Sequence, residues 1–230
     1  KGNWVAAEMK KTGEYDMSEE SFQYMRDLYD EEILGVDEHV GRLMESLEMW
    51  GILDNTIVVM FADHGEEFLE HGYFGHGMQC YNEIARVPLL IRVPGVAPTR
   101  VDKVCSLVDV GPTLAHLAGV PAMDKAEGVS LFPLEDNAAF ESRDMVLVEM
   151  LDYFEYWQYA AVTRDWKYMN WIGEKERVVR SPTAPGTNVE LYDMANDFDE
   201  RNNLVDEKPD LAAELKTRAE ALMQELDARD

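Results

Sequence analysis

The sequence predicts an α/β protein in two parts. Residues 1–135 are expected to pack helices on a mainly parallel sheet, and residues 136–230 to form a small antiparallel sheet with a closing helix. Two observations predict this. Residues 16–118 alternate helical and strand-like patterns, as α/β layers do. After residue 136, three strand-like stretches precede a single amphipathic segment.

Residues 16–50 are expected to form one long helix or two abutting helices. Asp16, with Glu19 three residues on, fits a capping box at the start. Gly51 stands where a helix would end. Spacings of four and three place apolar residues on one stripe, which predicts a helix that covers a sheet. The members of this stripe are Val36, Val40, Leu43, Leu47 and Trp50.

Two apolar runs predict strands in the first part. Thr56–Ala62 is β-branched and apolar, which favours a strand buried on both faces, and Val87–Val93 predicts a second buried strand. A short helix is expected between them, around Cys80–Ala85. Residues 106–118 are expected to be helical after Pro112.

The second part shows a different pattern. MVLVEM, YAAVTRDWKYMNW and NVELYDM are strand candidates, with a turn at Arg164-Asp165. Residues 181–188 are expected to be a loop. Pro209–Asp230 is expected to be an amphipathic helix, whose apolar side holds Leu211, Leu215, Leu222 and Leu226.

Acidic residues dominate the charge. The 46 acidic and 21 basic residues give a formal net charge of −25. Such a surface repels nucleic acid and anionic membranes, so neither is expected as a partner, although a salt-adapted source would give the same balance. An acidic protein that handles an anionic substrate needs a local cation, which favours a bound metal. The start at Lys1, without Met or leader, is what a segment of a longer protein would show.

The two cysteines stand in no zinc-ligand spacing. Two free or buried thiols are favoured over a disulfide between Cys80 and Cys105. The redox compartment stays open.

The stretch FADHGEEFLEHGYFGHG, residues 61–77, holds three of the five histidines. Asp63 and His64 follow the first predicted strand, at the end where α/β sheets collect ligands. A carboxylate oxygen and an imidazole nitrogen suit Mn²⁺, Mg²⁺ or Zn²⁺ and tolerate Ca²⁺. A cation would also offset the cost of burying Asp63. Two adjacent ligands are only part of a metal site, so a turn with an incidental histidine is the alternative.

His76 stands between two glycines, where the backbone can approach a ligand closely. An imidazolium there could contact an oxyanion or protonate a leaving oxygen. The alternative is a histidine satisfied by a loop carbonyl. Other polar residues are interpreted as structural or as a solvated helical face: His39, His71 and His116 in the first group, and Glu66, Glu67 and Glu70 in the second.

Three further motifs follow the histidine stretch in the chain. They are VDVGPTLAHLAGV, EGVSLFPL and ELYDMANDFDERNNL. Together with the stretch from Tyr29 to Gly95, which contains the histidine stretch, they resemble the second half of a sulfatase of the alkaline phosphatase superfamily, and the last is similar to the C-terminal sulfatase signature. The resemblance covers about residues 20–225. It implies a partial alkaline-phosphatase-like sandwich for the first part of the chain.

The resemblance also implies roles for three residues. Asp63 and His64 would be two ligands of a divalent cation, with Ca²⁺ expected and Mn²⁺ or Mg²⁺ as alternatives. Many sulfatases carry Asn at the second position, and His there resembles phosphonate monoester hydrolases and a large group of bacterial sulfatases. His76 would contact the sulfate or phosphate oxygens. The expected partner is a small aryl or carbohydrate sulfate.

The sequence departs from the family pattern at the nucleophile. It has no Cys/Ser-x-Pro-x-Arg motif, whose Cys or Ser becomes formylglycine, and no paired aspartates to complete the metal site. We therefore expect the C-terminal half of an arylsulfatase-like sulfuric ester hydrolase. In the complete enzyme a formylglycine hydrate would attack sulfur. The chain alone is expected to be inactive and to self-associate through exposed sheet edges.

Two other functions fit the residues. The Asp-His pair permits a phosphonate monoester or phosphodiester hydrolase of the same superfamily. A natural chain of this length, with no nucleophile, would instead be a non-catalytic binding module. The resemblance favours a periplasmic or secreted location, because bacterial sulfatases are often exported.

Overall fold

The computed structural model describes residues 18–72, 74–77, 79–121, 125–134, 143–151, 157–172 and 188–228. These residues divide into two compact units. One unit holds the described residues up to His76 together with Arg86–Arg100, and the other holds Gly77–Ala85 and the described residues from Val101 onward. This division reflects only how compactly the residues pack. The domain boundary expected between residues 135 and 136 is not tested by it and stays a prediction. Among the described residues, no helix combines the length and apolar character needed to cross a membrane.

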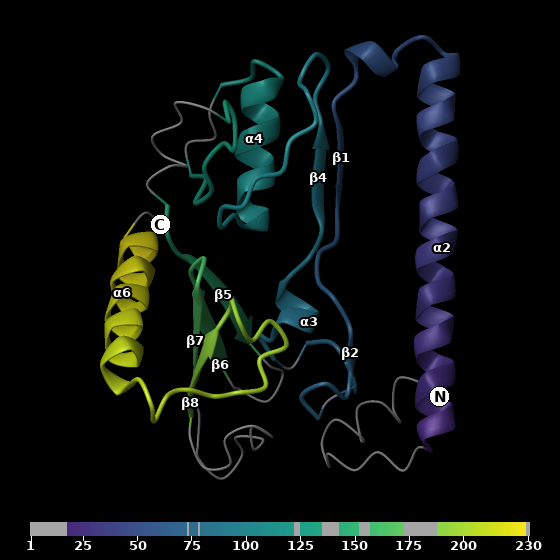
Figure 1. Ribbon diagram of the computed structural model, residues 1–230. Coiled ribbons are helices and arrows are strands. Elements are labelled where there is room, and N and C mark those ends of the chain that lie inside the picture. Colours follow the sequence, from purple (N-terminus) through teal and green to yellow (C-terminus); the bar gives the residue numbers. More distant parts are fainter. Residues whose placement is uncertain are drawn as a thin grey trace. The chain divides into compact units, whose positions relative to one another are not determined.

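Helix α2 (Glu19–Met49) is the long helix of the first unit (Figure 1). It is one continuous helix. The side chain of Ser18 caps it by accepting a hydrogen bond from a backbone N–H of the first turn. The expected cap, Asp16, lies outside the described residues.

The apolar stripe of α2 is covered only in part. Leu47 is buried, whereas Val36, Leu43 and Trp50 are exposed, Trp50 to 66%. A short 3₁₀ turn, η1 (Leu53–Asn55), follows the helix and leads into the first strand.

Strands β1 (Val58–Phe61) and β4 (Leu89–Arg92) lie side by side in the first unit (Figure 1). Both lie within the predicted runs. They pair antiparallel, as do all the described strand pairs, which differs from the mainly parallel sheet that the sequence predicts. A parallel pair needs a long crossover, usually a helix of a dozen or more residues. Here the connection contains only a short hairpin and the four-residue helix α3 (Asn82–Ala85).

Strand β1 is not buried on both faces among the described residues, since Phe61 is 47% exposed. The apolar run predicted the strand, but the residues that would cover both of its faces are not among those described.

The hairpin of β2 (Glu67–Phe68) and β3 (Phe74–Gly75) packs on α2 through aromatic rings. Phe22 of the helix lies edge-on to Phe74, with ring centroids 6.0 Å apart. Phe68 and Phe74 lie edge-on to each other at 5.7 Å. Buried aromatic contacts of this kind fix the hairpin on the helix. They therefore also hold the residue just before β2, Glu66, and the residue just after β3, His76.

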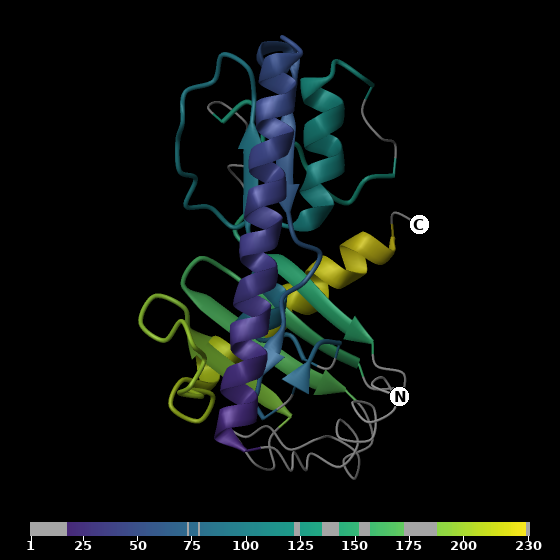
Figure 2. The same ribbon diagram turned by 90° about the vertical axis from the view of Figure 1, so that its right-hand side faces the viewer.

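The second unit is built on a four-stranded antiparallel sheet of order β5-β6-β7-β8 (Figure 2). This confirms the antiparallel second part. The turn expected at Arg164-Asp165 lies between the second and third of these strands. Of the loop expected at 181–188, only residue 188 is among the described residues. The strands are β5 (Val146–Leu151), β6 (Trp157–Val162), β7 (Trp166–Ile172) and β8 (Val189–Asp193).

Alternate residues of this sheet face two separate cores. One face packs against helix α6 (Pro209–Asp227), where Leu215 is buried as the predicted helical stripe requires. The other face packs against Cys80 and Tyr81, which follow the histidine loop in the chain. The first core includes Tyr159, Ala161, Tyr168 and Leu191, and the second includes Ala160, Met169 and Tyr192.

Helix α4 (Val110–Leu117) follows a 3₁₀ turn, η2 (Leu107–Asp109), so the helical stretch begins before Pro112. Both cysteines are free, Cys80 in the core and Cys105 at the surface. The favoured alternative, two free thiols, is confirmed.

Candidate active-site loop

The β2–β3 hairpin places His76 opposite Glu66. Its register pairs Glu67 with Gly75, so the next pair outward is Glu66 and His76. Glu66 Oε2 lies 2.9 Å from His76 Nδ1. A carboxylate can only accept, so Nδ1 carries the proton and donates it. Glu66 therefore fixes both the tautomer and the orientation of the His76 ring.

The glycines on either side of His76 make this placement possible. Gly75 has φ of 95° and Gly77 has φ of 86°. Both values lie in the left-handed region that glycine enters without a Cβ clash. The sequence FGHG thus reflects a backbone requirement at both positions.

The backbone carbonyl of the next residue orients the His64 ring. Its Nδ1 lies 2.9 Å from the carbonyl oxygen of Gly65, which can only accept, so Nδ1 carries a proton. In the neutral ring Nε2 then holds the lone pair. That atom lies 3.7 Å from Oδ2 of Asp63. The second oxygen of Asp63 accepts a hydrogen bond from the His64 backbone N–H at 3.0 Å.

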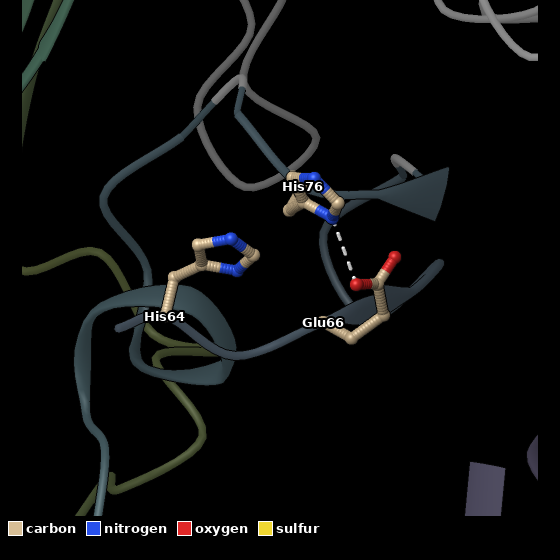
Figure 3. A group of neighbouring side chains, drawn as sticks. All are labelled: His64, Glu66 and His76. Atoms are coloured by element: carbon tan, nitrogen blue, oxygen red, sulfur yellow. Dashed lines mark hydrogen bonds and ion pairs between the residues drawn. The ribbon is translucent and has the colours of Figure 1, made fainter. Parts of the chain in front are cut away.

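The two histidines lie against each other. The ring centroids of His64 and His76 are 4.3 Å apart and the planes are tilted by 32°. One ligand atom from each of His64, Glu66 and His76 lies within 4.8 Å of the others. Figure 3 shows the three side chains pointing toward one another, with the dashed line joining His76 to Glu66. Residues twelve positions apart in the sequence therefore form one polar cluster.

Asp63 and His64 suit a divalent cation. Their facing donor atoms are an anionic oxygen and a nitrogen, 3.7 Å apart. Ligand bonds of about 2.0–2.5 Å allow such a pair to share one ion. Asp63 is 86% exposed, however, so it pays no burial cost that a cation would have to offset. The fit rests on the donor atoms and not on that cost.

The other acidic residues of the loop do not form a solvated helical face. Glu67 is fully buried in β2, Glu66 is part-buried against His76, and Glu70 accepts a hydrogen bond from the Phe68 backbone N–H. The stretch forms a hairpin because its two aromatic positions, Phe68 and Phe74, pack on Tyr29 and Phe22 of α2. Sequence reasoning missed Glu66 because that hairpin was not expected. An aromatic residue at each end of the turn, in FLEHGYF, was the available signal.

The remaining histidines lie elsewhere. His71 is buried, as a structural histidine would be. His39 is exposed on α2, where its Nδ1 lies 2.6 Å from the Gly35 carbonyl oxygen, and His116 is exposed in the last turn of α4.

Two family models match the chain. The model described as Sulfatase matches residues 3–120, which is more than half of the chain. The chain belongs to the sulfatase family. A second model, described as N-sulphoglucosamine sulphohydrolase, C-terminal, matches residues 69–227. The family expected from the motifs is thereby confirmed.

Known sulfatases resemble this chain along most of its length. The N-acetylglucosamine-6-O-sulfatase of Bacteroides thetaiotaomicron is 33% identical over 214 residues, which cover 89% of this chain and 35% of that protein. The choline-sulfatase of Rhizobium meliloti is 35% identical over 185 residues, covering 79% and 35%. This sulfatase chain thus spans about a third of the length of the curated relatives it matches.

Solved structures share its fold. One, in complex with its substrate D-glucosamine-2-N,6-O-disulfate, has a TM-score of 0.68 and 30% identity, covering 86% of this chain and 40% of that one. The phosphonate monoester hydrolase of Agrobacterium radiobacter has a TM-score of 0.75 and 23% identity, covering 92% and 43%. The α/β fold class and the likeness to alkaline-phosphatase-like sulfatases are therefore confirmed.

Proposed function

We propose that this chain supplies the cation-binding and sulfate-binding part of the active site of a sulfuric ester hydrolase. One observation carries the proposal. The single loop after β1 brings Asp63, His64 and His76 together, with the two imidazole centroids 4.3 Å apart. The sulfate-ester hydrolases among its relatives support the reaction class. The substrates proposed are aryl or carbohydrate sulfates, and a relative solved with a sulfated glucosamine favours the second.

Asp63 and His64 are proposed to hold the divalent cation, Ca²⁺ or else Mn²⁺ or Mg²⁺. Proton placement supports His64, because donation from Nδ1 to the Gly65 carbonyl leaves Nε2 as the ligand atom. When bound, the cation would supply positive charge that polarises the sulfate oxygens.

His76 is proposed to bind the sulfate group, with Glu66 holding its ring. The hydrogen bond to Glu66 Oε2 occupies Nδ1, so in the imidazolium form Nε2 carries the second proton and is the atom proposed to donate to a sulfate oxygen. Exposure supports this role, since the His76 side chain is 53% exposed while that of Glu66 is 24% exposed. A donor held toward the oxygen on which charge develops lowers the barrier.

The nucleophile is proposed to be a formylglycine outside these 230 residues. No Cys or Ser in the sequence lies in the required motif. We therefore predict that this chain alone does not turn over nitrophenyl sulfate. Turnover by the purified chain would contradict the proposal.

The role of His76 is tested in the protein encoded by the complete reading frame. His76→Ala is expected to lower kcat/KM for nitrophenyl sulfate by about 10²–10³-fold, the range for loss of one oxyanion donor. His116→Ala, an exposed histidine on α4, is the matched control and should leave kcat/KM unchanged. Equal rates for the two variants would contradict the assignment.

The role of Glu66 is tested by calorimetric titration of this chain with Mn²⁺. The cluster of His64, Glu66 and His76 could itself hold an ion. If Glu66 only positions His76, Glu66→Gln retains Mn²⁺ affinity while Asp63→Asn weakens it. Weakening by Glu66→Gln alone would instead make Glu66 a ligand.

A phosphonate monoester or phosphodiester hydrolase is the second candidate. The similarity in fold to a phosphonate monoester hydrolase favours keeping it. The complete protein should hydrolyse nitrophenyl sulfate with a higher kcat/KM than bis-nitrophenyl phosphate. The reverse order would support the second candidate.

A further inference from the structure

The hairpin that carries Glu66 and His76 is too short to set its own pairing. Strands β2 and β3 have two residues each, and Phe68 pairs with Phe74. A two-stranded hairpin is marginally stable by itself in water and gains stability by packing against a helix. A slip of one residue between the strands would turn side chains to the other face and take His76 away from Glu66. The contact between these two residues therefore depends on what holds the hairpin from outside.

Three residues on one face of α2 contact the hairpin within the first unit. Phe22, Arg26 and Tyr29 are spaced by four and three, which places them on the same side of a helix. Phe22 lies edge-on to Phe74, and Tyr29 lies edge-on to Phe68 with ring centroids 5.3 Å apart. Nη2 of Arg26 donates a hydrogen bond to the backbone carbonyl oxygen of Phe68 at 2.9 Å. The helix thus contacts both strands through rings and β2 also through a hydrogen bond.

Arg26 differs from the other arginine of α2. Arg42 is 64% exposed and pairs with Glu38 of the same helix, whereas Arg26 is 39% exposed and bonds to a carbonyl 42 residues away. Nη1 of Arg26 also lies 4.0 Å from Oε1 of Glu19, which is 89% exposed. Exposed ion pairs contribute little to stability. The hydrogen bond to the Phe68 carbonyl is therefore the stronger contact of Arg26.

The backbone at the end of β2 is determined by side chains. The carbonyl of Phe68 accepts the hydrogen bond from Arg26, and its N–H donates one to Oε2 of Glu70. The next residue, Leu69, has φ of 71°, a left-handed conformation that is unfavourable for a residue other than glycine. Such a conformation persists only where its surroundings determine it. Arg26 and Glu70 together therefore hold the backbone where the hairpin turns.

A hydrogen bond restrains the hairpin in a way that ring contacts do not. Edge-on rings attract each other over centroid separations of about 4.5–7 Å, so they tolerate sliding. The hydrogen bond from a guanidinium N–H to a carbonyl oxygen weakens once the heavy atoms separate beyond about 3.2 Å or lose alignment. Glu66 lies two residues before Phe68. Fixing the Phe68 carbonyl therefore limits how far Glu66 can move along α2.

We propose that Arg26 is a positioning residue, which fixes β2 on α2 and thereby keeps Glu66 opposite His76. Because Phe22 holds the other strand against the same face of the helix, a slip between the two strands would have to break contacts with α2. The consequence for catalysis rests on the proposed function of His76, whereas the effect on the contact between Glu66 and His76 does not.

The test is histidine-selective NMR of the ring nitrogens in the protein encoded by the complete reading frame. A His76→Gln variant assigns the His76 signals. In alkaline buffer, where imidazole rings are neutral, the signals show which ring nitrogen carries the proton. The unaltered protein should carry it on Nδ1, which donates to Glu66. Arg26→Met removes the donor to Phe68 and should move part of the population to the tautomer protonated on Nε2. Unchanged His76 signals in folded Arg26→Met would overturn the proposal.

Arg42→Met is the matched control. It removes the same charge from the same helix, where Arg42 bonds to Glu38. Its His76 signals should stay as in the unaltered protein, and an equal change in both variants would overturn the proposal. If Arg26→Met does not fold, Arg26→Gln takes its place under the same criteria, because the glutamine side chain is too short to place a donor where the guanidinium nitrogens lie.

Kinetics of the same proteins separates the positioning by Arg26 from the role of His76. Arg26→Met should lower kcat/KM for nitrophenyl sulfate by about 10–10²-fold, because a misplacement of about 1 Å can cost 10²-fold. In a His76→Ala background Arg26→Met should cause no further loss, since its effect passes through His76. A further loss of similar size in that background would overturn the proposal. If the His76 signals change but kcat/KM does not, the positioning stands and the role proposed for His76 fails.

Discussion

The two units of this sulfatase chain differ in how completely they bury their apolar side chains. In the second unit the sheet has a packed core on each face, with Leu215, Leu191 and Met169 almost fully inaccessible. In the first unit Leu34 of α2 is 70% exposed, and Trp50, which follows the last residue of α2, is 66% exposed. Yet the first unit carries Asp63, His64 and His76. The more self-sufficient unit is thus the one without the candidate site.

The two units therefore make different contributions to the protein. The second unit buries its own two cores, while the first unit presents site residues on elements with apolar side chains that the described residues leave exposed. Contiguous exposed apolar surface commonly marks a place where other protein packs. The matched residues span 35% of the length of these two relatives. We therefore propose that further sulfatase sequence covers the exposed apolar side chains of the first unit.

The largest expected effect is a difference in the free energy of unfolding between substitutions of two leucines, one in each unit. Leu215→Ala in α6 should lower the free energy of unfolding by about 2–5 kcal/mol, because it removes a fully buried side chain from the core. Leu34→Ala in α2 should change it by less than about 0.5 kcal/mol, because Leu34 is 70% exposed. Urea titrations of both variants measure this. Similar losses would show that the two units do not differ as described.

A smaller effect concerns self-association. We expect the chain to form dimers or larger species at micromolar concentration through the exposed apolar face of the first unit. Leu34→Glu should reduce the mean mass in light scattering. Val120→Glu adds the same charge at an exposed position of the second unit and is the control. A monodisperse monomer before any substitution would contradict the expectation.

The smallest effect is a pH dependence in the second unit. Hydrogen bonds from Asn196, its side chain foremost, lower the pKa of Asp193. A carboxylate with a lowered pKa stabilises the fold above its ordinary pKa, and that stability is lost as the pH falls through the folded value. Below about pH 4 the stability of the chain should therefore fall more steeply than that of Asp193→Asn. Parallel acid titrations of the two would show that the hydrogen bonds contribute nothing.

Local patterns predicted most of the elements. The spacing of apolar residues indicated α2 and α6, and apolar runs indicated β1, β4 and the strands of the second sheet. These signals are local because a helix or strand buries a face with a fixed period. The identities of Asp63, His64 and His76 also came from the sequence, through motifs, and their roles stay predictions.

Long-range contacts could not be predicted. The pairing of Lys167 with Glu200 joins β7 to the loop after β8, and no period in the sequence connects them. The antiparallel pairing of β1 with β4 depends on what the connection contains. The contact between Glu66 and His76 follows only once the hairpin register is known. In each case the partner is chosen by tertiary packing.

The central claim is that Asp63 and His64, together with His76, serve sulfate-ester hydrolysis. The most direct measurement is kcat/KM for nitrophenyl sulfate of the protein encoded by the complete reading frame, compared with its Asp63→Asn, His64→Ala double variant. We predict turnover by the unaltered protein and a loss of at least about 10²-fold in the double variant, as for removal of a main source of charge stabilisation. Equal activity of the two proteins would contradict the account.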